Sequence, residues 1–80
     1  MEPMVVILRS GMHLISKVEQ LEEEPHCHLQ GPYLIMDAGT LEPWSSWTTD
    51  TDVLIYSETL ATIVEPTETI RNKYELVTKE

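Results

Sequence analysis

The chain has 80 residues, with 14 acidic and 5 basic side chains and a formal net charge of −9. This length predicts one small domain, residues 1–80, whose core is too small to give much stability without a cross-link or a partner. Cys27 is the only cysteine, which excludes an intrachain disulfide and any zinc site built from paired cysteines. Oligomerisation is the remaining common route to stability.

The charge is unevenly placed along the chain. Residues 67–80 hold three basic and three acidic side chains, so the whole net charge of −9 lies in residues 1–66. Affinity for nucleic acid comes largely from cations that neutralise phosphates, and residues 1–66 contribute only Arg9 and Lys17. This balance disfavours DNA as a partner and is typical of an acidic surface that keeps a protein soluble. Residues 1–8 predict neither a signal peptide nor a membrane span, so we expect a cytoplasmic protein.

Two strands are predicted first. Residues 4–8 form an apolar run rich in β-branched side chains, which favours a strand. Residues 12–21 alternate imperfectly, with Leu14, Ser16 and Val18 on one face, and the preceding Ser10-Gly11 turn favours a hairpin over a helix. Residues 22–25 are three glutamates and a proline, which predicts a loop.

Three further strands are predicted downstream. Residues 27–37 form a strand region that is interrupted at 30–32, where the Gly-Pro pair predicts a bulge or bend. Residues 38–51 are rich in Gly, Pro, Ser and Thr, and we expect a long loop over Asp37 to Asp52. Residues 52–56 and 60–64 predict the last two strands, with a short turn between them.

A helix is predicted after Pro66. Thr67 suits the N-cap position, and Ile70, Tyr74 and Val77 recur at helical spacing. A helix over about 67–77 is too short to be stable alone and must pack on the rest of the chain or on a neighbour. The predicted fold is therefore all-β: a small, strongly bent five-stranded barrel over about residues 4–64, followed by a short C-terminal α-helix.

The first hairpin carries a resemblance to a known family. Ser10-Gly11, the small Ser16, the aliphatic Val18 and the acidic Glu22 follow the spacing of the first motif of Sm-like proteins, the family that includes bacterial Hfq. In that motif Ser16 stands where a glycine is usual, and His26 falls at the position of an asparagine that contacts a base.

The second hairpin extends this resemblance. Ile55 matches the aliphatic residue of the second motif, and Tyr56 and Ser57 occupy the place of an Arg-Gly or Lys-Gly pair. The chain also resembles short Sm-like proteins of bacteriophages, including cyanophages, which end in a phrase similar to residues 63–66. For a phage protein, the expected location is the cytoplasm of the host.

The resemblance implies a homo-oligomeric ring that binds RNA. A ring of about five to seven subunits would close by pairing the open edges of the last two strands, with Tyr56, Leu60 and Thr62 as contact candidates. His26, Tyr56 and Ser57 are the implied RNA-binding residues, since a tyrosine can stack on a base and a histidine can form hydrogen bonds to it. The alternative is that Tyr56 packs at a subunit contact and His26 is a solvated loop residue.

Other residue patterns predict no chemistry. His26, Cys27 and His28 form a weak metal-ligand pattern, and we predict no metal site. The sequence contains no phosphate-binding glycine loop and no nucleophile elbow, so we expect neither catalytic residues nor a cofactor, and no enzyme. Trp44 and Trp47 either close one end of the core or form an interaction loop.

Two functions therefore remain open. The first is a role in RNA metabolism with single-stranded RNA as partner, which the resemblance implies. The second is an acidic scaffold or protein-interaction ring without RNA affinity, which the charge favours because a net charge of −9 multiplies around a ring and repels a polyanion.

Overall fold

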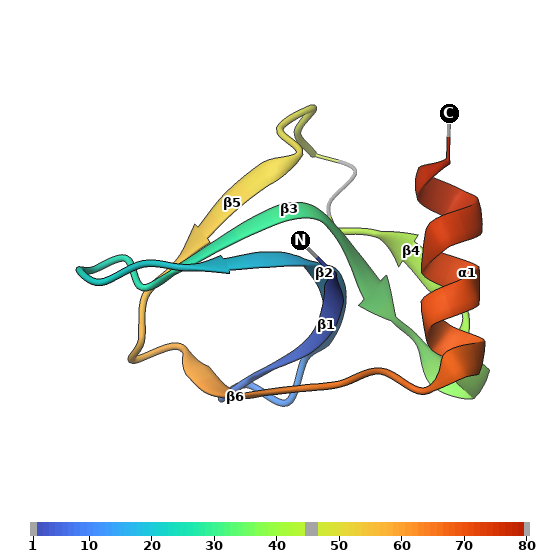
Figure 1. Cartoon of the computed structure of the whole chain (residues 1–80), viewed down its shortest axis with the longest axis horizontal. Helices are drawn as coiled ribbons and strands as arrows, with labels where there is room; N and C mark the ends of the chain where they lie inside the picture. The colour runs from blue at the N-terminus through green and yellow to red at the C-terminus, as the bar shows by residue number, and fades with distance from the viewer. Residues whose placement is uncertain (1, 45–46, 80) are drawn as a thin grey trace.

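The computed structural model describes residues 2–44 and 47–79, which form one antiparallel sheet and one helix (Figure 1). The elements in chain order are β1 (Pro3–Leu8), β2 (His13–Gln20), β3 (Cys27–Ile35), the 3-10 helix η1 (Asp37–Gly39), β4 (Leu41–Pro43), β5 (Asp52–Ile55), β6 (Leu60–Val64) and α1 (Glu68–Thr78). Over these residues, no helix has the length and apolar character that crossing a membrane requires.

The strand order is β4-β3-β2-β1-β6, and β5 also pairs with β3. Strand β3 pairs with β2 and also with two further strands: residues 27–30 pair with β5, and residues 33–35 pair with β4. Strand β6 pairs with β1. Within the described part of the chain no pairing joins β5 to β6, so the sheet is open, with β5 and β6 on two of its edges.

A bend at Gly31-Pro32 divides β3 into these two halves. Three steps along β3, from Gln30 to Tyr33, lie opposite two steps along β2, and Gly31 has a φ of +66°. The buried Ser16 hydroxyl, opposite the bend, lies 3.0 Å from the Gln30 carbonyl oxygen and can donate to it. The predicted bulge is confirmed, but β3 continues through it where an interruption was expected.

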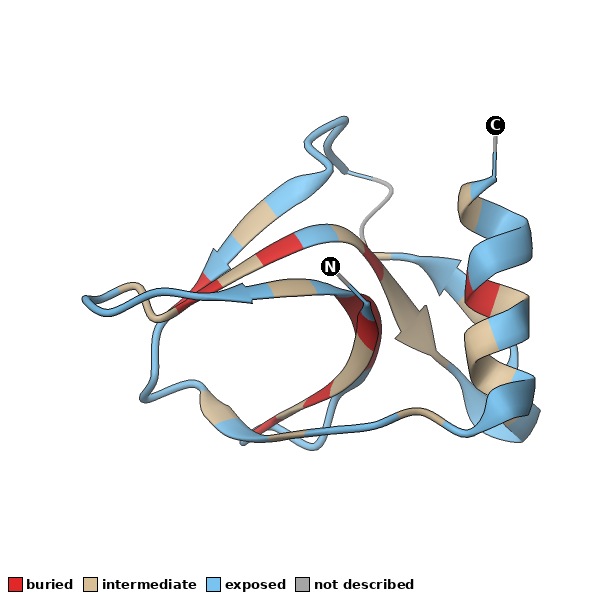
Figure 2. Ribbon diagram, in the orientation of Figure 1, coloured by how far each residue is buried: buried red, intermediate tan, exposed pale blue. Residues whose placement is uncertain are grey.

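The main core is one cluster of buried side chains from the sheet. Its buried side chains come from β1, β2, β3 and β5, as the colouring of Figure 2 shows: Val6, Leu8, Leu14, Cys27, Leu29 and Ile55. Burying an aliphatic side chain of this size contributes about 1.5–3 kcal/mol. Leu14 lies on the face of β2 that the sequence pattern predicts, together with the buried Ser16, whereas Ile15, on the opposite face, is also fully buried.

The helix begins as the sequence predicts, and the first part of its predicted apolar face packs on the sheet. The Thr67 hydroxyl accepts a hydrogen bond from the Ile70 N–H at 3.3 Å and caps the first turn. Tyr74 is 1 % exposed, and its hydroxyl lies 2.8 Å from the Gly31 carbonyl oxygen, to which it donates. The third residue of the predicted stripe, Val77, is 45 % exposed, so the packed face covers only the first part of the helix.

The count of strands differs from the prediction. We predicted five strands with a continuous loop over Asp37 to Asp52, and the described residues form six because β4 lies inside that segment. Strand β4 follows a tight turn in which Ala38 and Gly39 have φ values of 65° and 78°, and it pairs with the end of β3. A strand of three residues that ends in proline is too short to show a period of two.

Candidate functional site

The acidic loop between β2 and β3 meets the turn that follows β5, at the end of the molecule away from α1 (Figure 1). Both carboxylate oxygens of Glu24 accept from the Ser57 N–H, at 3.2 and 3.3 Å. The same carboxylate contacts Nδ1 of His26. His26 and Ser57, far apart in the sequence, therefore share one carboxylate.

The contacts of Glu24 keep it ionised. Hydrogen bonds from Ser57 are the main cause that holds the pKa of Glu24 below its ordinary value of 4.5, and the nearby His26 adds to this effect. At neutral pH the cluster therefore contains a carboxylate that acts only as an acceptor. It can bind N–H and O–H donors and repels phosphate.

Tyr56 lies at the edge of this cluster. Its side chain is 51 % exposed, and its carbonyl oxygen accepts the Thr59 N–H at 3.0 Å in the turn between β5 and β6. The other two residues predicted for a subunit contact differ from each other. Thr62 is exposed on β6, whereas Leu60 is half-buried and packs against the core of its own chain.

Cys27 and His28 point to opposite faces of β3. Cys27 is 2 % exposed, and burial raises the pKa of its thiol, with Glu24 adding to the effect, so the thiol stays protonated at neutral pH. His28 is flanked by Glu19, 3.3 Å from its Nδ1, and Asp52, 3.8 Å from its Nε2. Across the described residues, no group of three or more His, Cys, Asp or Glu side chains is placed to hold a metal ion.

The structure separates the two tryptophans. Trp44 is half-buried, packs against the core and donates its backbone N–H to the Pro32 carbonyl oxygen at 3.1 Å. Trp47 is 93 % exposed. The core interpretation therefore fits Trp44, and the interaction-loop interpretation stays a prediction for Trp47.

Glu24 is the residue of the cluster that sequence reasoning missed. The sequence pattern predicts only a loop for the three adjacent glutamates and does not distinguish one of them. Glu24 is the one that lies two positions before His26, and this proximity is the only signal in the sequence that distinguishes it. Its contact with Ser57 depends on how the loop meets the end of β5, which spacing alone does not reveal.

The fold and the cluster define a small antiparallel β-sheet protein with a C-terminal helix and an acidic polar cluster at one end of the sheet. The chain matches the model of a family of unknown function, DUF6561, over residues 1–79, and it belongs to this family. No curated protein matches the chain.

Proposed function

We propose that the chain is an Sm-like protein that closes its bent sheet into a barrel and joins neighbouring subunits into a ring. Two observations support this assembly: β5 pairs on one side with β3, and β6 pairs on one side with β1, in the described residues. Unpaired strand edges are templates for pairing with another chain. A head-to-tail contact between β5 and β6 repeats by rotation and closes into a ring.

The function we propose for this ring is binding of single-stranded RNA at His26, Tyr56 and Ser57. One observation carries the proposal: Glu24 brings His26 and Ser57 to the same point, beside the exposed Tyr56. The three residues that the resemblance implies thus lie at one end of the sheet. The Tyr56 ring can stack on a base, and His26 can donate to or accept from a base edge.

Glu24 is the internal competitor of the proposed ligand. Its carboxylate accepts a hydrogen bond from the Ser57 N–H. A carbonyl oxygen of a bound base would need the same N–H as its donor. RNA binding therefore requires displacement of Glu24, and the loss of its hydrogen bonds weakens the affinity for RNA. The site favours a base over a phosphate because the neighbouring Glu22 and Glu23 add negative charge.

The experiment is a fluorescence anisotropy titration with oligo-uridine and oligo-adenosine at low salt. We expect binding that Tyr56→Ala abolishes and Glu24→Gln strengthens. Glu23→Gln is the matched control, because it removes the same charge from the same exposed loop but leaves the contacts to His26 and Ser57 in place. Equal effects of the two glutamate variants would refute the competitor role of Glu24.

A second candidate is an acidic ring that binds a protein partner. The observation that favours it is Trp47, which is 93 % exposed on a chain with a net charge of −9. Large exposed aromatic side chains often dominate protein interfaces. No RNA binding at about 50 mM salt, where phosphate contacts are strong, would contradict the RNA proposal and leave this second function.

A further inference from the structure

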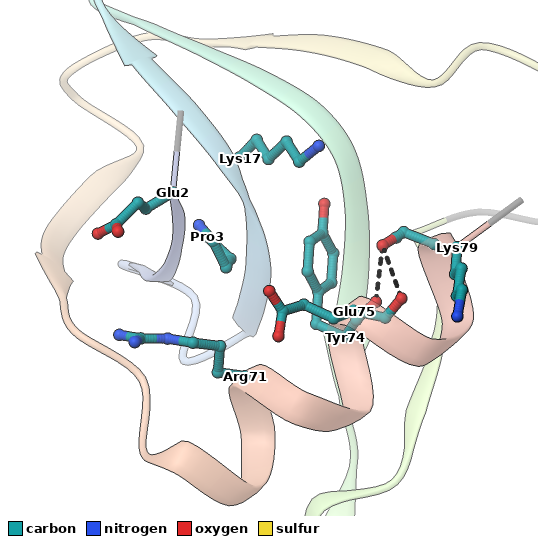
Figure 3. Close-up of a pocket in the computed structure, with 8 residues that line it drawn as sticks. Glu2, Pro3, Lys17, Arg71, Tyr74, Glu75 and Lys79 are labelled. Atoms are coloured by element: carbon teal, nitrogen blue, oxygen red, sulfur yellow. Dashed lines mark hydrogen bonds between the residues drawn. The ribbon is translucent and has the colours of Figure 1, made fainter.

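The few cations of the chain gather at the end of the molecule opposite the acidic loop. Three of the five basic side chains, Lys17, Arg71 and Lys79, line one cleft of about 570 Å³ between α1 and strands β1 and β2. Figure 3 shows Tyr74 in the middle of this cleft, with Arg71 on one side, Lys79 on the other and Lys17 above. On a chain with a net charge of −9, this concentration of positive charge is the exception.

Arg71 has an unused donor at the wall of the cleft. Its Nε atom is buried and has no hydrogen-bond acceptor among residues 2–44 and 47–79. Its Nη1 atom lies 3.7 Å from a carboxylate oxygen of the exposed Glu68, a long contact that leaves the Nε edge of the guanidinium unpaired. A buried charged donor is costly without an acceptor, so Nε needs one from outside the described residues, either a water or a ligand that enters the cleft.

We propose that this cleft binds a small oxyanion, a phosphate or carboxylate group of a soluble ligand. The guanidinium of Arg71 presents Nε and Nη donors in the planar fork that matches the oxygens of such a group. Lys17 and Lys79 supply further charge. This site is separate from the Glu24 cluster, and its existence does not depend on RNA binding.

The acidic residues of the cleft limit what it accepts. Glu2 and Glu75 also line it, and Glu68 contacts Arg71, so the three cations are balanced by three carboxylates. One small oxyanion adds little negative charge to this balance, whereas a polyanion such as RNA would bring further phosphates against the carboxylates. A short oligonucleotide is therefore expected to bind here more weakly than a single phosphate.

The test is a two-dimensional NMR titration of the full chain with inorganic phosphate, with acetate as the second arm. We expect saturable shifts of the Arg71 Nε–H and of amides around Lys17 and Lys79, with dissociation constants of about 1 mM. Saturation by phosphate or by acetate supports the site, and the tighter of the two assigns the class of the ligand.

Matched variants separate the cleft from general charge effects. Arg71→Gln should abolish saturation, and Arg9→Gln, which removes one exposed cation that does not line the cleft, should leave it unchanged. If Arg71→Gln fails to fold, Lys79→Gln, at an exposed position after α1, should weaken binding several-fold. The proposal is overturned if neither anion gives saturable shifts, or if Arg9→Gln weakens binding as much as the cleft variants.

Discussion

At the residue scale, Glu24 links the charge of the loop to the geometry of the β5–β6 turn. Its pKa is lowered in the folded chain, so its stabilising contacts are present above the ordinary value of 4.5 and are lost as the pH falls through the lower, folded-state value. We expect the Ser57 amide resonance to move in an acid titration with a midpoint below 4.5, and not in Glu24→Gln. A midpoint at or above 4.5 would contradict the contact.

Tyr74 is the residue that holds the helix to the bend of β3. Its hydroxyl lies 2.8 and 3.1 Å from the carbonyl oxygens of Gly31 and Gln30, and its ring meets Tyr33 edge to face at a centroid distance of 6.0 Å. We expect Tyr74→Phe to lower the free energy of unfolding by about 1 kcal/mol, because the donor is lost while the ring stays.

Urea denaturation measures this effect, and Tyr33→Phe is the control. The Tyr33 hydroxyl makes one long, exposed contact of 3.5 Å with the Val77 carbonyl oxygen, so its removal should change the unfolding free energy little. If both variants lose equal stability, the hydroxyl of Tyr74 does not anchor the helix.

At the element scale, the sequence predicted most of the elements because local signals determine them. The turn at Ser10-Gly11, the bulge at Gly31-Pro32 and the cap at Thr67 each rest on local chemistry, and all three appear in the structure. Strand β4 was not predicted, because it forms through pairing with β3 and its own sequence shows no alternating pattern. The Glu24 contact and the cationic cleft were missed for the same reason, since each joins segments distant along the chain.

The helix cap gives a test of these local signals. Thr67→Ala removes the oxygen that accepts the Ile70 N–H, and we expect a loss of about 1 kcal/mol in the free energy of unfolding. Thr69→Ala is the control, because Thr69 is exposed in the first turn of α1 and alanine favours a helix there. The cap would be irrelevant to stability if both variants unfolded at the same denaturant concentration.

At the scale of the whole molecule, acidic and basic side chains are concentrated at opposite ends, and two strands have unpaired edges. The acidic loop with Glu24 lies at one end of the sheet, and the cleft with Arg71 lies beside α1 at the other (Figure 1). Strands β5 and β6 leave backbone donors and acceptors on edges that no described residue pairs. In a small domain these edges favour assembly, because pairing them adds hydrogen bonds and buries further apolar surface.

The ring is the central claim, and the native mass of the chain at micromolar concentration tests it most directly. Multi-angle light scattering should give about five to seven times the chain mass, which is 9.2 kDa. Thr62→Arg, a bulky charged change on the exposed face of β6, should reduce this mass, whereas Thr69→Arg on α1 should not. A species of 9.2 kDa for the unmodified chain would contradict the ring.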